Sequence, residues 1–170
     1  MKLTALFILI LVPGVSRAQL LQWSPSFIKE SSGSVIITCD ASKGNLGLVG
    51  YTPVTDVYVH IGAITSLSSG ASDWKYVVNS NFSTPASIVQ ASSVGNNKWT
   101  FTINGGLRTF FNITNTSERI LKIAILFRSG NGSKVQRNSD GSDMYVPVYD
   151  AGLYARIDTP LLPPLFKMIP

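Results

Sequence analysis

The chain has 170 residues and a formal net charge of +5, from 14 basic and 9 acidic side chains. This length gives room for a single domain with its own hydrophobic core. The basic residues are scattered and form no cluster interleaved with aromatic residues, which argues against nucleic-acid binding. With one cysteine and one histidine, the sequence supplies neither an internal disulfide nor the usual ligands of zinc. We therefore expect no metal and no cofactor.

The first 18 residues have the pattern of a secretory signal peptide. Lys2 gives a positive start, residues 3–12 are mainly apolar, and small residues precede a cleavage point after Ala18. The apolar run is too short to span a bilayer comfortably, and no second run of about 18 apolar residues follows. We expect an exported chain that begins at Gln19. Without Lys2 and Arg17 it carries 12 basic and 9 acidic residues, a net charge of +3.

The first predicted strand follows an irregular segment. Residues 19–33 mix aromatic residues, proline and serine, and we expect a lead-in that lies along the domain edge. From Ser34 the residues Val35, Ile37 and Cys39 alternate with their neighbours, which predicts a strand with these three side chains in the core. Cys39 is therefore expected to be a small buried residue and not a nucleophile.

Two alternating segments in the centre of the chain, 56–62 and 73–78, predict a pair of strands joined by a Ser/Gly-rich connection. In the first segment Tyr58 and His60 lie on the face opposite to the valines and isoleucine. In the second, Trp74, Tyr76 and Val78 are expected to share one face. Pairing of the two strands would then place these rings beside each other.

The remaining segments continue the strand pattern. Residues 88–89 suit a short edge strand, and 98–103 predict a strand with Trp99 and two other apolar residues inside. We expect a compact or helical turn over 105–112, because Phe110 and Phe111 are adjacent. Further along we expect the following elements: a buried strand over 120–128, a hairpin turn at Asn131-Gly132, a return over 134–136, a strand over 143–149 and a closing strand over 153–157.

Pro147 lacks a backbone N–H, so its strand should lie at a sheet edge or form a bulge there. The tail 159–170 is rich in proline and apolar residues, which is typical of a linker toward a following module. About seven to nine strands without a long helix predict an all-β, immunoglobulin-like β-sandwich, which we place over residues 34–158.

The sequence offers little for catalysis. His60 would have to serve any Ser-His-Asp arrangement, but no Gly-x-Ser-x-Gly motif presents a nucleophile. The acidic residues are scattered, whereas glycoside hydrolysis needs two carboxylates across a cleft. Asp140 and Asp143 share a turn but fall short of a calcium cage. We expect no enzyme activity.

The sequence offers more for sugar binding than for catalysis, because flat aromatic rings on rigid strands suit the apolar faces of sugar rings. The candidate residues are Tyr58, His60, Trp74 and Tyr76. For each ring the alternative is a place in the core. The two alternatives have equal weight for Trp74, whereas the hydroxyl groups of Tyr58 and Tyr76 favour partial exposure.

Six motifs follow one another along the chain: Ile37-Thr-Cys-Asp-Ala-Ser-Lys-Gly-Asn-Leu-Gly-Leu-Val-Gly-Tyr51, Asp56-Val-Tyr-Val-His-Ile-Gly62, Asp73-Trp-Lys-Tyr-Val77, Gly95-Asn-Asn-Lys-Trp99, Ile123-Ala-Ile-Leu-Phe-Arg128 and Gly141-Ser-Asp-Met-Tyr145. In this order they resemble the N-terminal β-sandwich module of secreted bacterial α-amylase-family glycoside hydrolases and related multi-modular surface proteins. The Val-Tyr-x-His and Asp-Trp motifs also resemble starch-binding modules. That second resemblance implies a glucan-binding role for His60, Trp74 and Tyr76.

These resemblances imply a secreted or cell-surface module that binds polysaccharide, above all α-glucan, without catalysis. No catalytic barrel follows in this sequence, so enzyme activity is not implied; the expected partners are a polysaccharide and a neighbouring catalytic domain. The first alternative is a spacer module without a ligand. A second alternative is protein adhesion through an exposed sheet edge near Pro147.

Overall fold

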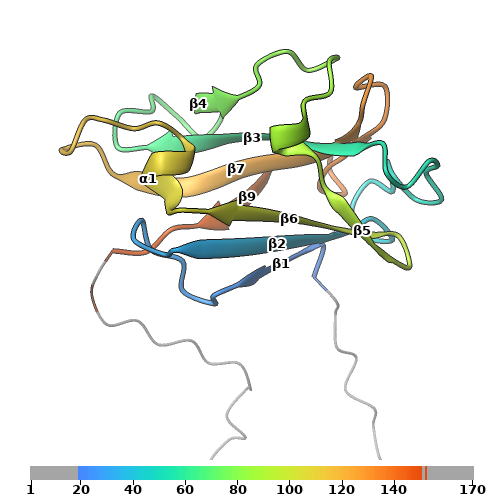
Figure 1. Ribbon diagram of the computed structural model, residues 1–170, viewed down its shortest axis with the longest axis horizontal. Coiled ribbons are helices and arrows are strands. Elements are labelled where there is room, and N and C mark those ends of the chain that lie inside the picture. The colour runs from blue at the N-terminus through green and yellow to red at the C-terminus, as the bar shows by residue number, and fades with distance from the viewer. Residues whose placement is uncertain (1–18, 151, 153–170) are drawn as a thin grey trace, which may run out of the picture.

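The computed structural model describes residues 19–150 and residue 152 (Figure 1). The predicted signal peptide at 1–18, the predicted strand at 153–157 and the predicted linker at 159–170 lie outside the described residues. The end of the domain predicted at residue 158 lies outside them as well. None of the helices in the described part is long and apolar enough to cross a membrane.

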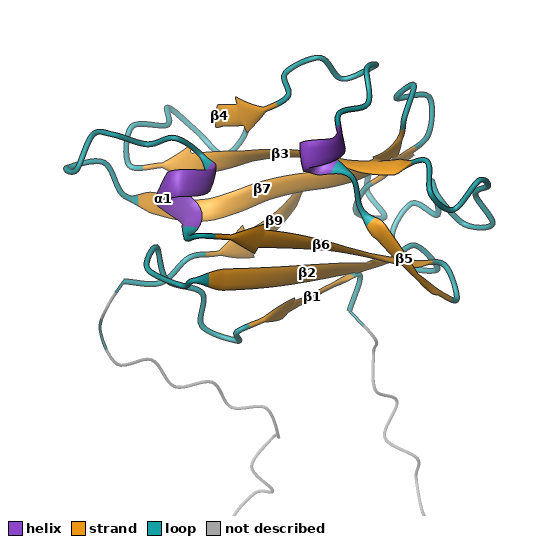
Figure 2. Cartoon of the chain, viewed as in Figure 1, coloured by secondary structure: helices purple, strands orange, loops and turns teal. Residues whose placement is uncertain are grey.

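Two stacked antiparallel sheets form the described part of the chain, and helical turns make up very little of it (Figures 1 and 2). The first sheet has the order β1-β2-β6-β5, and the second has the order β4-β3-β7-β8, with β9 also paired to β7. The strands are β1 (Leu21–Ser24), β2 (Ser34–Asp40), β3 (Val57–Thr65), β4 (Lys75–Val78), β5 (Ser92–Gly95), β6 (Lys98–Asn104), β7 (Ile120–Ser129), β8 (Val135–Gln136) and β9 (Met144–Pro147).

This strand order confirms the predicted all-β, immunoglobulin-like sandwich. When β1 to β7 are read as strands A, B, C, C′, D, E and F, the sheets have the orders ABED and C′CF. The paired strands β8 and β9 together take the place of strand G, beside β7. Pro147 is the last residue of β9, where a missing N–H costs the least pairing.

The core lies between the two sheets, where alternate residues of the long strands meet. β2 and β6 pair in unbroken register from Ser34↔Asn104 to Asp40↔Lys98. β3 and β7 pair from Val57↔Ser129 to Ile64↔Lys122. The buried inward-facing side chains of these four strands are Val35, Ile37, Cys39, Val57, Val59, Ile61, Trp99, Phe101, Ile103, Ile123, Ile125 and Phe127. These are the positions that the period-two pattern predicts for a half-buried strand.

Cys39 is fully buried in this core, as predicted. Burial, reinforced by the negative charge of neighbouring Asp40, strongly raises the pKa of the Cys39 thiol. The thiolate is the nucleophilic form of cysteine, so this side chain is chemically inert in the folded protein.

Two local predictions are wrong. Part of the segment predicted as an irregular lead-in is β1, which pairs with β2 from Leu21↔Cys39 to Ser24↔Ile36. Residues 88–89 belong not to a strand but to a 3-10 turn, η1 (Ser87–Val89), which buries Val89 and leaves Ile88 64% exposed. In both places the apolar pattern is too short to distinguish a strand from a turn or loop, and tertiary contacts determine the secondary structure.

The predicted turns are confirmed. One helical turn, α1 (Leu107–Phe110), follows β6; it ends at Phe110, and Phe111 comes directly after it. Asn131 and Gly132 form the tip of the β7–β8 hairpin, where the Gly132 N–H donates to the Ser129 carbonyl at 2.9 Å. Gly132 has φ +72°, a conformation that glycine adopts without steric cost.

Candidate binding site

The outer face of the second sheet carries two of the predicted site residues, Tyr58 and His60. Their neighbours on β3 point into the core, so these two side chains point outward. Across the sheet, Tyr58 pairs with Arg128 and His60 pairs with Leu126 on β7. Paired residues of antiparallel strands lie on the same face, so these four side chains form one surface.

Aromatic rings from three other segments gather around His60. The Trp74 ring stacks on the imidazole, with centroids 5.4 Å apart and an interplanar angle of 26°. Phe82 meets the imidazole edge to face at 5.0 Å, and Tyr145 meets Trp74 in the same manner at 6.4 Å. We call His60, Trp74, Phe82 and Tyr145 the aromatic cluster. It places the Trp74 indole on the outside of the sheet, although the ring also packs against the core.

Gly62 makes room for Trp74 on this face. A Cβ atom at position 62 would lie 3.4 Å from the Trp74 ring and 3.1 Å from Val77. It would also lie 3.0 Å from the Lys75 carbonyl oxygen, closer than a side chain normally approaches backbone. The glycine therefore lets the segment before β4 lie down over β3.

Three members of the aromatic cluster, His60, Trp74 and Phe82, line a pocket of about 300 Å³. One wall of the pocket is an ion pair in which Arg137 donates to the Asp143 carboxylate. The ion pair comes from the segment that joins β8 to β9. The residues that line the pocket are His60, Ser72, Trp74, Phe82, Leu126, Arg137 and Asp143. Aromatic side chains and charged hydrogen-bonding groups thus line the same pocket, and most of the surface that faces it is polar.

His60 is held neutral in this setting. Burial, and secondarily the positive charge of Arg128, lowers the pKa of the imidazole. Its Nδ1 atom is buried and forms no hydrogen bond within the described residues. A neutral imidazole has one N–H donor and one acceptor nitrogen, so it suits hydroxyl ligands better than ionic ones.

Tyr58 faces a buried arginine instead of the pocket. The Arg128 side chain is fully buried and donates to the carbonyls of Ser129 and Gly130, both at 2.9 Å. Its guanidinium lies 5.8 Å from the Tyr58 ring centroid and 5.2 Å from that of Phe82. Tyr58 and Phe82 therefore enclose a cation whose hydrogen bonds go to backbone carbonyls.

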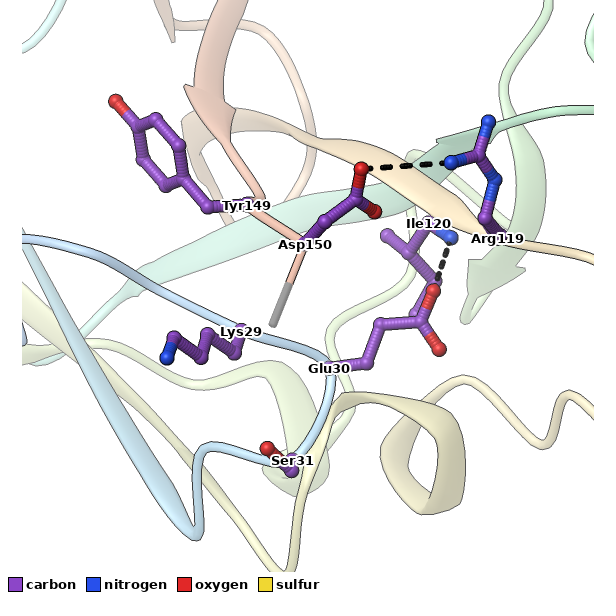
Figure 3. A pocket seen from close by; sticks show the side chains of 7 residues that line it. All are labelled: Lys29, Glu30, Ser31, Arg119, Ile120, Tyr149 and Asp150. Atoms are coloured by element: carbon purple, nitrogen blue, oxygen red, sulfur yellow. Dashed lines mark hydrogen bonds and ion pairs between the residues drawn. The ribbon is translucent and has the colours of Figure 1, made fainter. Parts of the chain in front are cut away.

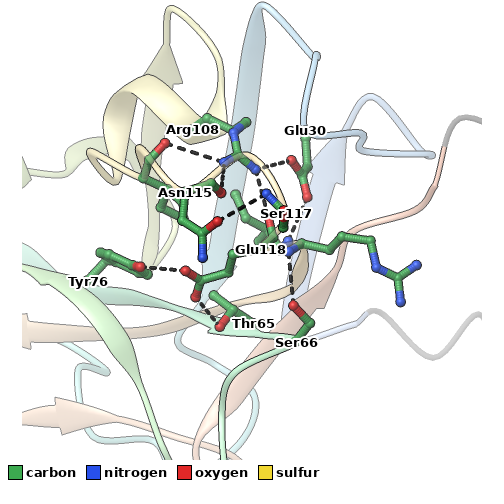
Figure 4. Close-up of polar contacts among 11 residues, drawn as sticks. Glu30, Thr65, Ser66, Tyr76, Arg108, Asn115, Ser117 and Glu118 are labelled. Atoms are coloured by element: carbon green, nitrogen blue, oxygen red, sulfur yellow. Dashed lines mark hydrogen bonds and ion pairs between the residues drawn. The ribbon is translucent and has the colours of Figure 1, made fainter.

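The prediction that Trp74 and Tyr76 share one face is wrong. The β3–β4 register shifts between Ile61 and Ala63, and Tyr76 has φ +54°. This bulge interrupts the alternation, so that Val77, rather than Tyr76, lies beside Trp74 over Gly62. The Tyr76 hydroxyl instead donates to the Glu118 carboxylate at 2.6 Å (Figure 4).

Glu118 belongs to a structural polar network at one end of the sandwich (Figure 4). Glu118 is 2% exposed, and its carboxylate also accepts a hydrogen bond from the Thr65 hydroxyl at 2.5 Å. Arg108 donates to the backbone carbonyls of Glu118 and Asn115 and forms an ion pair with Glu30 at 2.8 Å. These bonds hold the α1–β7 loop against the end of the sandwich, which explains Tyr76 as a structural residue.

This network predicts a pH-dependent contribution to stability. The hydrogen bonds from Thr65 and Tyr76 lower the pKa of Glu118 in the folded protein. At acid pH the unfolded chain therefore binds more protons than the folded one, and stability falls as pH drops. The contribution is complete above the ordinary glutamate pKa of about 4.3 and is lost as pH falls through the lower folded value.

Chemical denaturation at a series of pH values measures this effect. Glu118→Gln is expected to be less stable than the native chain at neutral pH, with the difference shrinking toward acid pH. Tyr76→Phe removes one of the two donors and should give an intermediate pH dependence. Parallel stability curves for the native chain and Glu118→Gln would contradict the assignment.

A second pocket, of about 270 Å³, lies at the same end as the polar network (Figure 3). Glu30 accepts a hydrogen bond from the Ile120 N–H at 2.6 Å, and Arg119 pairs with Asp150 at 3.4 Å. The ring of Tyr149 points away from these groups and packs edge to face with Phe27. Among the described residues in its lining, Tyr149 is the single aromatic one, so this pocket offers a sugar fewer rings than the one beside His60.

The structure thus brings two of the four candidates, His60 and Trp74, together at a pocket, and gives Tyr58 and Tyr76 other contacts. Sequence reasoning missed Phe82 and Arg137 as site residues, and it considered Asp143 only for calcium. Phe82 is an isolated aromatic residue in a Ser/Asn-rich loop, which was the one available signal. Within residues 19–150, no group of His, Cys, Asp and Glu side chains could hold a metal ion. No family model matches the chain, and a search of curated proteins finds no match to it.

Proposed function

We propose that this protein is a non-catalytic carbohydrate-binding module whose ligand is a neutral polysaccharide such as an α-glucan. The observation that carries the proposal is the pocket where the Trp74 and His60 rings meet the Arg137–Asp143 ion pair. A sugar ring has apolar C–H faces and a rim of hydroxyl groups. The indole offers a surface for the faces, and the ion pair and the imidazole offer partners for the hydroxyls.

The pocket supports binding more than catalysis. Its lining contains a single carboxylate, Asp143, and this carboxylate is paired with Arg137. Hydrolysis of a glycosidic bond normally needs a second carboxyl group across the bond, about 5–9.5 Å away. The choice of α-glucan comes from the resemblance to amylase-associated and starch-binding modules, and secretion comes from the pattern of the first 18 residues.

Binding is expected to be weak for a short sugar. An aromatic contact contributes about 0.5–1.5 kcal/mol beyond area burial, and one pocket holds few rings. Since each 1.4 kcal/mol is a tenfold change in affinity, one stacked ring alone gives little. The affinity should therefore rise with the number of sugar residues that one polymer brings to the surface.

Calorimetry and affinity electrophoresis with starch, dextran and xylan test the proposal. The chain should bind starch in the micromolar to millimolar range, and xylan less well. If the folded protein binds none of the three at millimolar sugar concentration, the proposal fails. The module would then be better explained as a spacer without a ligand, whose aromatic cluster stabilises the outer face of the sheet.

A further inference from the structure

A small pocket at another place on the sandwich is not used by the proposed site. It has a volume of about 170 Å³ and lies between residues 50–54, which precede β3, and the β5–β6 hairpin. Both segments lie at the right-hand end of the sandwich in Figure 1. We call it the hairpin pocket. Among the residues that line it are Tyr51, Thr52, Asn96, Asn97 and the largely buried Trp99.

Hydrogen bonds on both sides hold the walls of the hairpin pocket together. The Gly50 N–H donates to the Asn97 Oδ1 atom at 2.8 Å, and the Trp99 Nε1–H donates to the Val54 carbonyl at 2.9 Å. The Tyr51 hydroxyl donates to Asp56 at 2.5 Å, which fixes the position of the ring. The pocket is therefore formed before any ligand binds, which lowers the entropic cost of binding.

The hairpin itself is a rigid turn. Asn96 and Asn97 connect β5 to β6 with φ +50° and +58°, and positive values at both central positions are what a type I′ turn requires. Asparagine tolerates this conformation better than most residues. The Asn97 carbonyl is fixed as well, because it accepts the Ala41 N–H at 2.8 Å. The Asn96 side chain thus extends from a backbone that has little freedom.

The lining of the hairpin pocket is uncharged but keeps unused hydrogen-bonding groups. Neither the Thr52 hydroxyl nor the Asn96 amide is engaged with another residue in the part of the chain that the structure describes. The Asn97 Oδ1 atom is occupied by Gly50, which leaves its N–H₂ donors. Val54, which also lines the pocket, is 46% exposed. The lining therefore combines apolar surface with a few neutral polar groups.

We propose that the hairpin pocket is a second sugar-binding subsite, which takes one neutral sugar residue of the same polysaccharide. The inference rests on the proposed function, because it assumes that this module binds glycans. A cavity of about 170 Å³ lined by two aromatic residues, neutral amide and hydroxyl groups and Val54 matches an uncharged sugar and provides no charge partner for an anionic one. Two subsites on one module make a long polymer bind more tightly than a short one.

The test uses the full chain, a linear α-glucan oligosaccharide of six or seven sugars and soluble starch as probes. Asn96→Gly with Thr52→Val removes the two unused polar groups, and glycine at position 96 keeps the positive φ without strain. The matched control is Asn112→Gly, since Asn112 is also exposed and has φ +54°, on the loop after α1. Circular dichroism and thermal unfolding establish that each variant is folded.

The native chain should bind two oligosaccharides in calorimetry, and the double variant one, while its affinity for soluble starch falls about tenfold. The NMR signals of residues 95–97 should shift on titration of the native chain and stay in place in the double variant. Asn112→Gly should behave as the native chain.

Three outcomes separate this inference from the proposed function. Unchanged stoichiometry and starch affinity in the folded double variant, with binding lost in Trp74→Ala, overturn the second subsite and leave the first. Binding that survives Trp74→Ala and disappears in the double variant supports the hairpin pocket and overturns the site beside His60. Absence of any glucan binding by the native chain overturns both.

Discussion

Replacing Trp99 with alanine is expected to lower the free energy of unfolding by about 3–5 kcal/mol, the cost of removing a large buried aromatic side chain. Trp99 is 2% exposed and lies on β6, where it pairs with Cys39 of β2. Its Nε1–H also donates to the Val54 carbonyl, so the substitution leaves a cavity and frees the 50–54 segment. A marginally stable domain with about 5–15 kcal/mol in total would lose much of its stability.

Urea denaturation followed by circular dichroism measures this loss. The control is Trp23→Ala, because Trp23 is half-buried on β1 and its Nε1–H donates to the nearby Ser26 carbonyl at 3.3 Å. We expect a clearly smaller loss for the control. A stability for Trp99→Ala within about 1 kcal/mol of the native chain would mean that this ring is not part of the core.

Replacing Trp74 with alanine is expected to remove glucan binding at the pocket beside His60 while the domain stays folded. Trp74 supplies the largest ring at the pocket beside His60, and it lies on the outer face of the sheet. The loss of one stacked ring corresponds to about a tenfold loss in affinity. At this pocket, weak binding reduced tenfold falls below detection for a short oligosaccharide. The hairpin pocket should still bind one oligosaccharide, and binding of starch should remain measurable.

Calorimetry with starch and denaturation in urea are to be run on the same variant. Trp23→Ala is again the control, since Trp23 is not among the described residues that line the pocket beside His60, and the variant should retain binding. If Trp74→Ala is destabilised as strongly as Trp99→Ala, the Trp74 ring is a core residue and the proposed site is wrong. If the variant is folded and binds starch as the native chain does, the ligand does not contact Trp74.

The alternation of residues along the strands predicts only part of the aromatic cluster. The outward direction of Tyr58 and His60 follows from the alternation of β3 and holds in the structure. Alternation predicted the wrong partner for Trp74, because a bulge at Tyr76 exchanges the faces of β4. The contact between Phe82 and His60 depends on how the loop after β4 folds back over the sheet, which no periodic pattern in the sequence predicts.

The sequence by itself determined the two-layer fold of this protein, because long segments of alternating apolar residues, such as those around Ile37, Val59, Trp99 and Ile125, can bury one face only as strands of a sandwich. The tertiary structure alone decided three features: that residues 21–24 form a strand, that Tyr76 bonds to Glu118, and that Arg137 and Asp143 lie beside His60. Each depends on groups far apart in the chain. A short strand, a bulge or an ion pair is stabilised by contacts with residues distant in the sequence, so local propensity cannot predict it.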